Sequence, residues 1–368
     1  MVRPADFLKV LKENGLQPLI GVPCSMIAPL INYALDNPEE IECLNPVNEA
    51  HALGLACGVY MGSGKIPVVF LQNSGLGNLV NPLTSLSQTY RLPAFLLVTW
   101  RGASGPGTDA PEHDIMGRDL EAYLRVLHIP YGILSESRYA EQIARLRQTA
   151  EADGIPVAAV VAHRFFDNYE SHTLSQVGRQ PLNTHEAIRI IKETLVSYTF
   201  LSTTGFISRE SFDIARTPDF YMLGSMGLVP AVGCGIALTQ PEKRVAILDG
   251  DGAALMHLGL LPFIGSRKPR KLLHFILDNE VYASTGNQPT VSPLVRFDEV
   301  ALASGYRNAC CVSTGDELLS VLEEMKEAEG PSLVWVKVAS GSRDDLGRVS
   351  FSPEEIKKRF IKSLWGGC

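Results

Sequence analysis

The sequence predicts an α/β protein with two doubly wound parallel-sheet domains. Short, almost entirely apolar runs alternate with longer segments of helical periodicity, as in parallel sheets that helices cover on both faces. The 368 residues suffice for two to three domains of about 150 residues each. A polar and aromatic stretch, residues 163–185, follows neither pattern and separates two halves of similar length. We therefore place one domain at residues 1–170, a linker at 171–184 and a second domain at 185–368.

The expected elements follow from these patterns in chain order. Strands are predicted at residues 18–22, 67–71, 94–100 and 157–162 in the first half, and at 200–204, 244–249, 272–278 and 333–338 in the second. Helices are predicted most clearly at residues 5–14 and 316–329, where apolar side chains recur at helical spacing. Gly15 marks the end of the first of these helices.

Composition excludes several classes of protein. The chain has 33 basic and 40 acidic residues, and a net charge of −7 argues against a nucleic-acid partner. Seven cysteines without zinc-ligand spacing indicate reduced thiols in a cytoplasmic protein. The N-terminus has no apolar signal region, and the uncharged stretch 221–241 is interrupted by glycines and prolines. We therefore expect no membrane span.

The strongest chemical signal lies in the second half. The strand at 244–249 runs directly into Gly250-Asp251-Gly252, and the strand at 272–278 is followed by Asn279. Parallel strands end at one edge of a sheet, so these oxygen donors are expected to be neighbours there. Hard oxygen ligands suit Mg²⁺, and the amides at a helix start suit phosphate. A tight turn and a simple cap would explain the same residues without a ligand.

Two further motifs lie in the first half. Glu49 begins a helix rich in small residues, where the helix dipole stabilises a carboxylate whether or not it has a chemical role. Residues 72–78 follow a strand with two amides, a hydroxyl and two glycines, but Val80 occupies the third glycine position of a dinucleotide loop. Leu238 breaks the same pattern after Gly233. The pattern therefore argues against a Rossmann dinucleotide site, although residues 72–78 still offer hydrogen bonds to a polar ligand.

Together these motifs resemble those of the thiamine-diphosphate-dependent decarboxylases. That family has a catalytic glutamate in a pyrimidine-binding domain and a GDG…N metal motif in a diphosphate-binding domain, and the order here is the same. The chain has no room for the middle domain of longer members. It is most similar to the short phosphonopyruvate and sulfopyruvate decarboxylases, in residues 64–86, 99–102, 202–210, 224–227 and 284–290. Cys24 stands where many of the former have aspartate, and is more like the latter.

The resemblance implies a cofactor site. Mg²⁺ would be held by Asp251, Asn279 and the backbone carbonyl of Val281. Thiamine diphosphate would be bound by Glu49, Asn73, Gly75, Thr203, Thr204, Gly205, Ser225, Met226, Gly250, Asp251, Gly252, Ala253, Asn279, Val281 and Tyr282. Glu49 would be buried and would activate the cofactor through its aminopyrimidine ring. The enzyme would be a homo-oligomer, at least a dimer, with the active site between subunits.

The resemblance also implies a substrate, a small anionic 2-oxo acid. The leading candidate is 3-phosphonopyruvate, decarboxylated to phosphonoacetaldehyde in phosphonate and antibiotic biosynthesis. Sulfopyruvate, which would give sulfoacetaldehyde, is the alternative. The head group would be bound by Ser25, Asn73, Ser74, Arg101 and His113, with Arg209 as a further candidate. His113 would bind the head group or supply the proton that the product needs.

Two other classes of function stay open at this point. A Mg²⁺-dependent phosphotransferase would need a further carboxylate cluster, which the sequence does not show. A regulatory protein that binds thiamine or a nucleotide would not need Glu49 together with Asp251 and Asn279.

Overall fold

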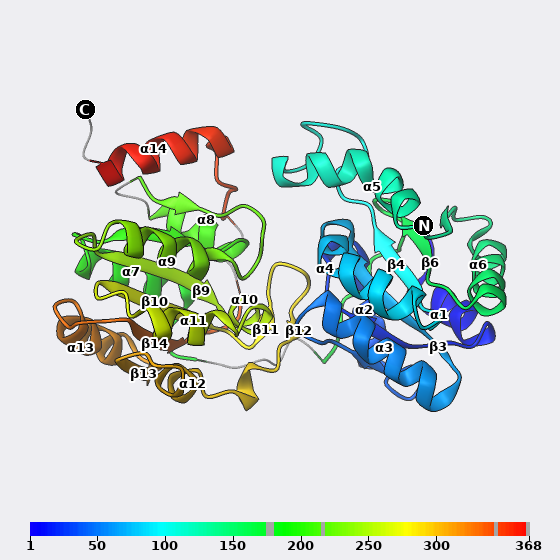
Figure 1. Ribbon diagram of the computed structural model, residues 1–368, viewed down its shortest axis with the longest axis horizontal. Coiled ribbons are helices and arrows are strands. Elements are labelled where there is room, and N and C mark those ends of the chain that lie inside the picture. Colours follow the sequence, from blue (N-terminus) through cyan, green and yellow to red (C-terminus); the bar gives the residue numbers. More distant parts are fainter. Residues whose placement is uncertain (174–179, 215–217, 342–344, 366–368) are drawn as a thin grey trace. The chain divides into compact units, whose positions relative to one another are not determined.

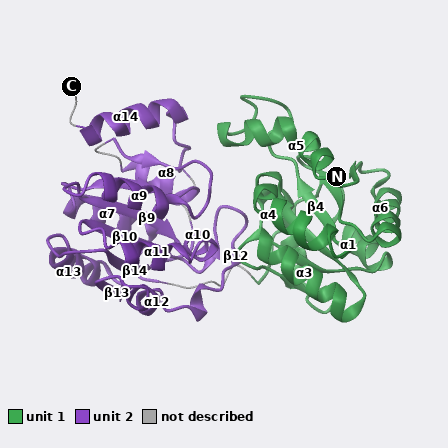
Figure 2. Cartoon of the chain, in the orientation of Figure 1, with its two compact units in different colours: residues 1–175 green, residues 176–368 purple. Residues whose placement is uncertain are grey.

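A computed structural model describes residues 1–173, 180–214, 218–341 and 345–365. The chain divides into unit 1, Met1–Ser175, and unit 2, Gln176–Cys368 (Figures 1 and 2). This division falls inside the predicted linker, of which residues 174–179 lie outside the described residues. Before it, Thr173 and its neighbours bond to Asp36 of unit 1.

Unit 1 is built on a parallel sheet with the strand order β2-β1-β3-β4-β6-β5. The strands are β1 (Leu16–Gly21), β2 (Cys43–Leu44), β3 (Ile66–Gln72), β4 (Phe95–Thr99), β5 (Tyr131–Ile133) and β6 (Val157–Val161). One face of this sheet packs on α1 (Pro4–Glu13), α2 (Ala28–Asp36) and α6 (Tyr139–Asp153). The other face packs on α3 (Glu49–Ser63), α4 (Leu76–Pro82) and α5 (Asp114–Val126). Successive residues of β3, such as Val69 and Phe70, enter opposite cores, which is why its sequence is apolar from residue 66 to residue 71.

Unit 2 is built on a second parallel sheet, with the order β13-β14-β10-β9-β7-β8. Its strands are β7 (Thr199–Ser202), β8 (Phe220–Tyr221), β9 (Val245–Gly250), β10 (Leu272–Asp278), β13 (Asn308–Val312) and β14 (Ser332–Lys337). The helices α7 (Thr184–Thr194) and α13 (Gly315–Met325) cover one face. The remaining helices are α8 (Phe206–Asp213), α9 (Val229–Thr239), α10 (Asp251–Met256), α11 (Leu260–Arg267), α12 (Phe297–Ala303) and α14 (Pro353–Trp365). A separate antiparallel hairpin joins β11 (Val281–Tyr282) to β12 (Gln288–Pro289).

The two sheets share one topology. Read from its other end, β8-β7-β9-β10-β14-β13 repeats the order of the first sheet in chain sequence. The winding direction reverses between β1 and β3 in unit 1, and between β7 and β9 in unit 2. Open α/β sheets bind ligands outside the carboxyl ends of their strands at such a reversal. The fold therefore directs attention to the loops after these strands.

The predicted fold class is confirmed, and each of the eight predicted strands is present. The sequence does not predict β2, β5, β8 or β13. Each of these lies at an edge of its sheet. β2, β5 and β8 have only two or three residues, and β13 lacks a run of Val, Ile or Leu. The predicted helix 316–329 is wrong at its end, because the helix stops at Met325 and Glu329 instead pairs with Arg270 and Arg307.

Two further findings concern the helices and the cysteines in the described part of the chain. None of its helices combines the length and apolar character needed to cross a bilayer. The six cysteines within the described ranges are all free thiols.

Candidate active site

Glu49 is the first residue of α3, and the local sequence fixes it there. The side chain of Asn48 caps the helix by accepting the backbone N–H of Ala50 at 2.8 Å. The Glu49 side chain is buried, with the residue 7% exposed, as the sequence analysis expects. Asn78 Nδ2 on α4 donates to Glu49 Oε2 at 2.7 Å. A Cβ at Gly75 would stand 2.4 Å from Glu49 Oε1, so a glycine there gives the carboxylate its place.

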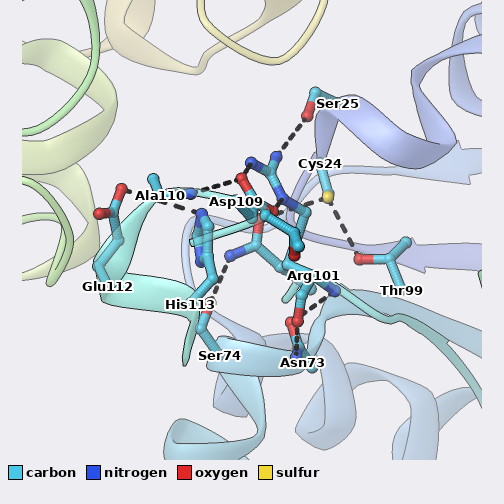
Figure 3. Close-up of polar contacts among 12 residues, drawn as sticks. Cys24, Ser25, Asn73, Ser74, Thr99, Arg101, Asp109, Ala110, Glu112 and His113 are labelled. Atoms are coloured by element: carbon cyan, nitrogen blue, oxygen red, sulfur yellow. Dashed lines mark hydrogen bonds and ion pairs between the residues drawn. The ribbon is translucent and has the colours of Figure 1, made fainter. Parts of the chain in front are cut away.

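Arg101 is the centre of a polar cluster that follows β4 (Figure 3). Its Nε and Nη2 both donate to the Asp109 carboxylate at 2.6 Å, and its Nη1 donates to Ser25 Oγ at 3.2 Å. The Arg101 guanidinium holds the pKa of Asp109 well below its usual range. Asn73 Nδ2 donates to the backbone carbonyl of Arg101 at 2.9 Å, which ties the end of β3 to the end of β4. The structure thus brings Ser25, Asn73 and Arg101 together.

Cys24, Ser74 and His113 surround this cluster in Figure 3. Cys24 Sγ lies 3.3 Å from Thr99 Oγ1, and burial raises the pKa of the thiol. Ser74 Oγ accepts from Gln72 at 2.7 Å. His113 ends the turn before α5, with its Nε2 3.9 Å from Glu112. Arg209, by contrast, lies on α8 in unit 2, where its guanidinium stacks 5.3 Å from the ring of Phe206.

In unit 2 the loops after β7, β9 and β10 carry the predicted residues. Thr203 Oγ1 is buried and finds no hydrogen-bond partner within the described ranges. Thr204 Oγ1 donates to the carbonyl of Leu223 at 2.5 Å. Gly205 precedes α8 with φ of +88°, a conformation that favours glycine. This turn therefore presents an unsatisfied hydroxyl at the point where the winding direction reverses.

Asp251 begins α10 and is only 3% exposed. Thr290 Oγ1 donates to Asp251 Oδ2 at 2.5 Å. Burial, together with the nearby Asp278 carboxylate, raises the pKa of Asp251 well above its usual range. At the end of the neighbouring β10, Asn279 Oδ1 accepts the backbone N–H of Val281 at 3.2 Å.

The loop that carries Met226 closes on the same region. A Cβ at Gly252 would stand 2.6 Å from Tyr282 Cε1 and 3.4 Å from Met226 Cε. Ser225 has φ of +54°, unusual for a residue other than glycine, and so marks local backbone strain. Gly227, with φ of +81°, lies where a Cβ would meet the carbonyl of Ala253 at 2.6 Å. Backbone thus approaches backbone here with no space for larger side chains.

These groups fit a magnesium–diphosphate ligand. A carboxylate, an amide oxygen and backbone carbonyls form the hard donor set that Mg²⁺ takes, with water and phosphate completing its shell. The buried carboxylate of Asp251 lies near the carboxylate of Asp278, and a bound cation would offset the repulsion between the two negative charges. The described residues contain no cluster of three or more His, Cys, Asp or Glu side chains that could hold a metal ion.

Sequence reasoning missed several residues of this arrangement. Asn78 belongs to the motif 72–78 and Thr290 to the segment 284–290, but the sequence analysis assigns no role to either residue. Asp109 and Ser292 had no signal of their own, because acidic and hydroxyl side chains in loops are common. Each is recognised only through the partner that the fold brings to it: Asn78 through Glu49, Asp109 through Arg101, and Thr290 and Ser292 through buried carboxylates.

Comparison with known proteins agrees with this geometry. The family model "Thiamine pyrophosphate enzyme, N-terminal TPP binding domain" matches residues 5–120, and its counterpart "Thiamine pyrophosphate enzyme, C-terminal TPP binding domain" matches residues 204–336. The chain is therefore a thiamine pyrophosphate enzyme, thiamine pyrophosphate being another name for thiamine diphosphate.

Individual relatives show which family of thiamine pyrophosphate enzymes the chain belongs to. Phosphonopyruvate decarboxylase of Streptomyces viridochromogenes is 34% identical over 98% of this chain and 94% of its own length. Sulfopyruvate decarboxylase of Methanosarcina acetivorans is 28% identical over 99% of this chain and 98% of its own length. Sulfopyruvate decarboxylase of Methanothermobacter thermautotrophicus has a β subunit 38% identical over 49% of this chain and an α subunit 34% identical over 33%, covering 95% and 71% of those subunits. The chain belongs to the phosphonopyruvate decarboxylase family, which confirms both the resemblance and the prediction of a carboxy-lyase.

The Arg101–Asp109 pair predicts a pH-dependent contribution to stability. Replacing Asp109 with Asn should lower the free energy of unfolding at pH 7 by about 1 to 2 kcal/mol, because a charge-assisted pair of hydrogen bonds is weakened. The folded-state pKa of Asp109 lies below the unfolded value of about 4. The difference between variant and wild type should therefore be full above about pH 4 and shrink as the pH falls further.

Urea denaturation at pH 7, 5 and 3.5 measures this difference. Asp119→Asn is the control, since the Arg118–Asp119 pair is exposed and its loss should change stability by less than about 0.5 kcal/mol. Equal stability of Asp109→Asn and wild type at pH 7 would show that the pair is only a surface contact.

Proposed function

We propose that the chain catalyses the Mg²⁺- and thiamine-diphosphate-dependent decarboxylation of 3-phosphonopyruvate to phosphonoacetaldehyde and CO₂. The observation that carries the proposal is the pairing of a buried carboxylate in the N-terminal cofactor-binding part with an Asp251–Asn279 donor set in the C-terminal part. The phosphonopyruvate decarboxylase of S. viridochromogenes, similar along almost its whole length, supports the choice of substrate. The product would enter phosphonate biosynthesis, including that of phosphonate antibiotics.

Sulfopyruvate is the second candidate substrate. Cys24, in place of an aspartate, and the full-length similarity to a sulfopyruvate decarboxylase favour it. Both substrates are 2-oxo acids with an anionic head group, so the proposed mechanism is the same.

The residues of unit 2 would hold the cofactor by its charged end. When bound, thiamine diphosphate supplies the electron sink that makes loss of CO₂ possible. Asp251, Asn279 and the Val281 carbonyl would bind Mg²⁺, and the Thr203 hydroxyl would donate to the diphosphate. The amides that begin α8 and α10 would add donors at two loops of the sheet edge. Met226, against Gly252, would support the body of the cofactor.

Glu49 would hold a proton for the cofactor's aminopyrimidine ring. The burial of Glu49 excludes water, which would compete with the ring for a hydrogen bond to the carboxyl group. Asn78 donates to one carboxylate oxygen and so fixes the orientation of the group. Asn73 and Gly75 lie in the turn that follows β3 and would complete the part of the cofactor site around Glu49.

The cluster around Arg101 would receive the head group of the substrate. Asp109 holds the Nε and Nη2 side of the Arg101 guanidinium, so a phosphonate or sulfonate would bind at its Nη1 side, next to Ser25. Asn73 and Ser74 add polar groups beside this position. His113 is close to this cluster and would bind the head group or supply a proton through its imidazole (Figure 3).

An oligomer, at least a dimer, is part of the proposal. The α3 helix exposes His51, Gly54, Leu55 and Gly58, and α9, which has the equivalent place in the shared topology, exposes Val232, Gly235 and Leu238. Small and apolar residues on an outward helix face suit close packing against another chain. Each active site would then take its two halves from different subunits. The free cysteines fit the reducing cytoplasm in which we place the enzyme.

Thiamine diphosphate with Mg²⁺ should raise the melting temperature. At a concentration about 100 times Kd, binding stabilises the folded state by ~2.7 kcal/mol, a rise of roughly 5 to 10 °C for units of this size. Differential scanning calorimetry measures it, with Mg-ADP as the control for a nucleotide-binding regulator. A shift with Mg-ADP and none with the thiamine cofactor would contradict the proposal.

Arg101 should decide the preference for an anionic head group. In Arg101→Ala, kcat/KM for phosphonopyruvate should fall roughly ten- to a hundredfold, because a charge-assisted contact is lost, while kcat/KM for pyruvate changes little. CO₂ release from phosphonopyruvate, sulfopyruvate and pyruvate measures this, with Arg118→Ala on the exposed side of α5 as the control. A wild-type enzyme that prefers pyruvate would refute the proposed substrate class.

A further inference from the structure

Two buried hydroxyl groups connect two buried carboxylates in unit 2. Thr290 and Ser292 follow the β11–β12 hairpin, and both are less than one-tenth exposed, as are Asp251 and Asp278. Thr290 Oγ1 donates to Asp251 Oδ2 at 2.5 Å, and Ser292 Oγ donates to Asp278 Oδ1 at 2.7 Å. The two hydroxyl oxygens are 3.0 Å apart. The pair therefore bridges the loop after β9 and the end of β10.

The Asp278 end of this bridge is firmly held. Asp278 Oδ2 accepts from Trp335 Nε1 at 2.8 Å and from Lys337 Nζ at 3.0 Å, both on the neighbouring strand β14. Lys337 also pairs with Glu280. Because Asp278 has charged and neutral donors on a paired strand, it serves as a fixed point from which the Thr290–Ser292 bridge sets the position of Asp251.

The same segment holds the turn between the other two proposed metal ligands. Glu280, between Asn279 and Val281, has φ of +65°, which is unfavourable for a residue with a side chain. Two hydrogen bonds maintain this conformation: Glu280 N–H donates to Asp278 Oδ1 at 3.0 Å, and Thr290 N–H donates to the Glu280 carbonyl at 2.9 Å. Thr290 thus contacts the loops of all three ligands, with its hydroxyl on one side and its amide on the other.

We propose that Thr290 and Ser292 are positioning residues that set the affinity of the site for its divalent cation. The inference rests on the proposed function, because it takes Asp251, Asn279 and Val281 as the metal ligands. The Thr290 hydroxyl orients the Asp251 carboxylate, and Ser292 connects that orientation to the Asn279 turn through Asp278. Groups that orient metal ligands in this way are typically worth ten- to a hundredfold in metal affinity.

Thr290→Val tests the proposal, because it removes the hydroxyl and keeps the branched shape. Isothermal titration of Mg²⁺ into protein with saturating thiamine diphosphate should show a Kd at least about tenfold higher than in wild type. Thr290→Ser restores a hydroxyl and should recover most of the affinity. Thr285→Val is the matched control: Thr285 lies in the same hairpin, but its hydroxyl bonds to the Tyr282 carbonyl and the Gln288 amide oxygen rather than to a carboxylate. It should bind Mg²⁺ with the wild-type Kd.

The outcomes separate the two proposals. A wild-type chain that binds no thiamine diphosphate with Mg²⁺ refutes the proposed function and the inference together. Wild-type binding with an unchanged Mg²⁺ Kd in Thr290→Val refutes the positioning role alone, even if the variant melts at a lower temperature. If circular dichroism shows that Thr290→Val is unfolded, Ser292→Ala breaks the bridge at its other end. An unchanged Mg²⁺ Kd in that variant overturns the proposal in the same way.

Discussion

A carboxylate costs free energy to bury, and in each unit of this chain the carboxylate that we propose to act on the cofactor is buried near the edge of its sheet where the parallel strands end. Glu49 and Asp251 are 7% and 3% exposed. Each is the first residue of a helix, and each has a neutral side chain that donates to one of its oxygens, Asn78 for Glu49 and Thr290 for Asp251. Such partners reduce the cost of burial without neutralising the charge. We propose that Mg²⁺ at Asp251 and a proton at Glu49 complete these two sites.

The shared topology explains how one architecture supplies two different sites. In both units the loops beside the reversal of winding carry the polar groups, as the general rule for open α/β sheets requires. In unit 1 the loops after β1 and β3, which flank the reversal, carry Ser25 and Asn73, and the loop after the next strand, β4, carries Arg101. In unit 2 the loops after β7 and β9 carry the Thr203 hydroxyl, which finds no hydrogen-bond partner within the described ranges, and the Asp251 carboxylate, groups that suit a diphosphate and Mg²⁺. We therefore propose that the two units differ in function because their loops differ, while the sheets beneath them have the same strand order.

The interior of the fold could be predicted from the sequence, and its edges could not. A strand buried on both faces is apolar at almost every position, so β3, β4, β9 and β10 appear in the sequence as nearly continuous apolar runs. Edge strands such as β5 and β13 lack that constraint. At the site, the Gly250–Gly252 motif is visible because the chemistry needs adjacent residues. The supporting contacts are not, because Asn78 and Thr290 lie 29 and 39 residues from the carboxylates they hold. Only the fold defines such pairs.

We propose that a carboxylate of one subunit and the metal site of another act on the same cofactor. This arrangement is tested most directly by mixing subunits that carry Glu49→Gln with subunits that carry Asp251→Asn, and isolating the mixed oligomers through two affinity tags. Each variant alone should be nearly inactive. A mixed dimer should regain about half the wild-type turnover, because one of its two sites then has both native residues. Mixed oligomers no more active than either parent would contradict the proposal.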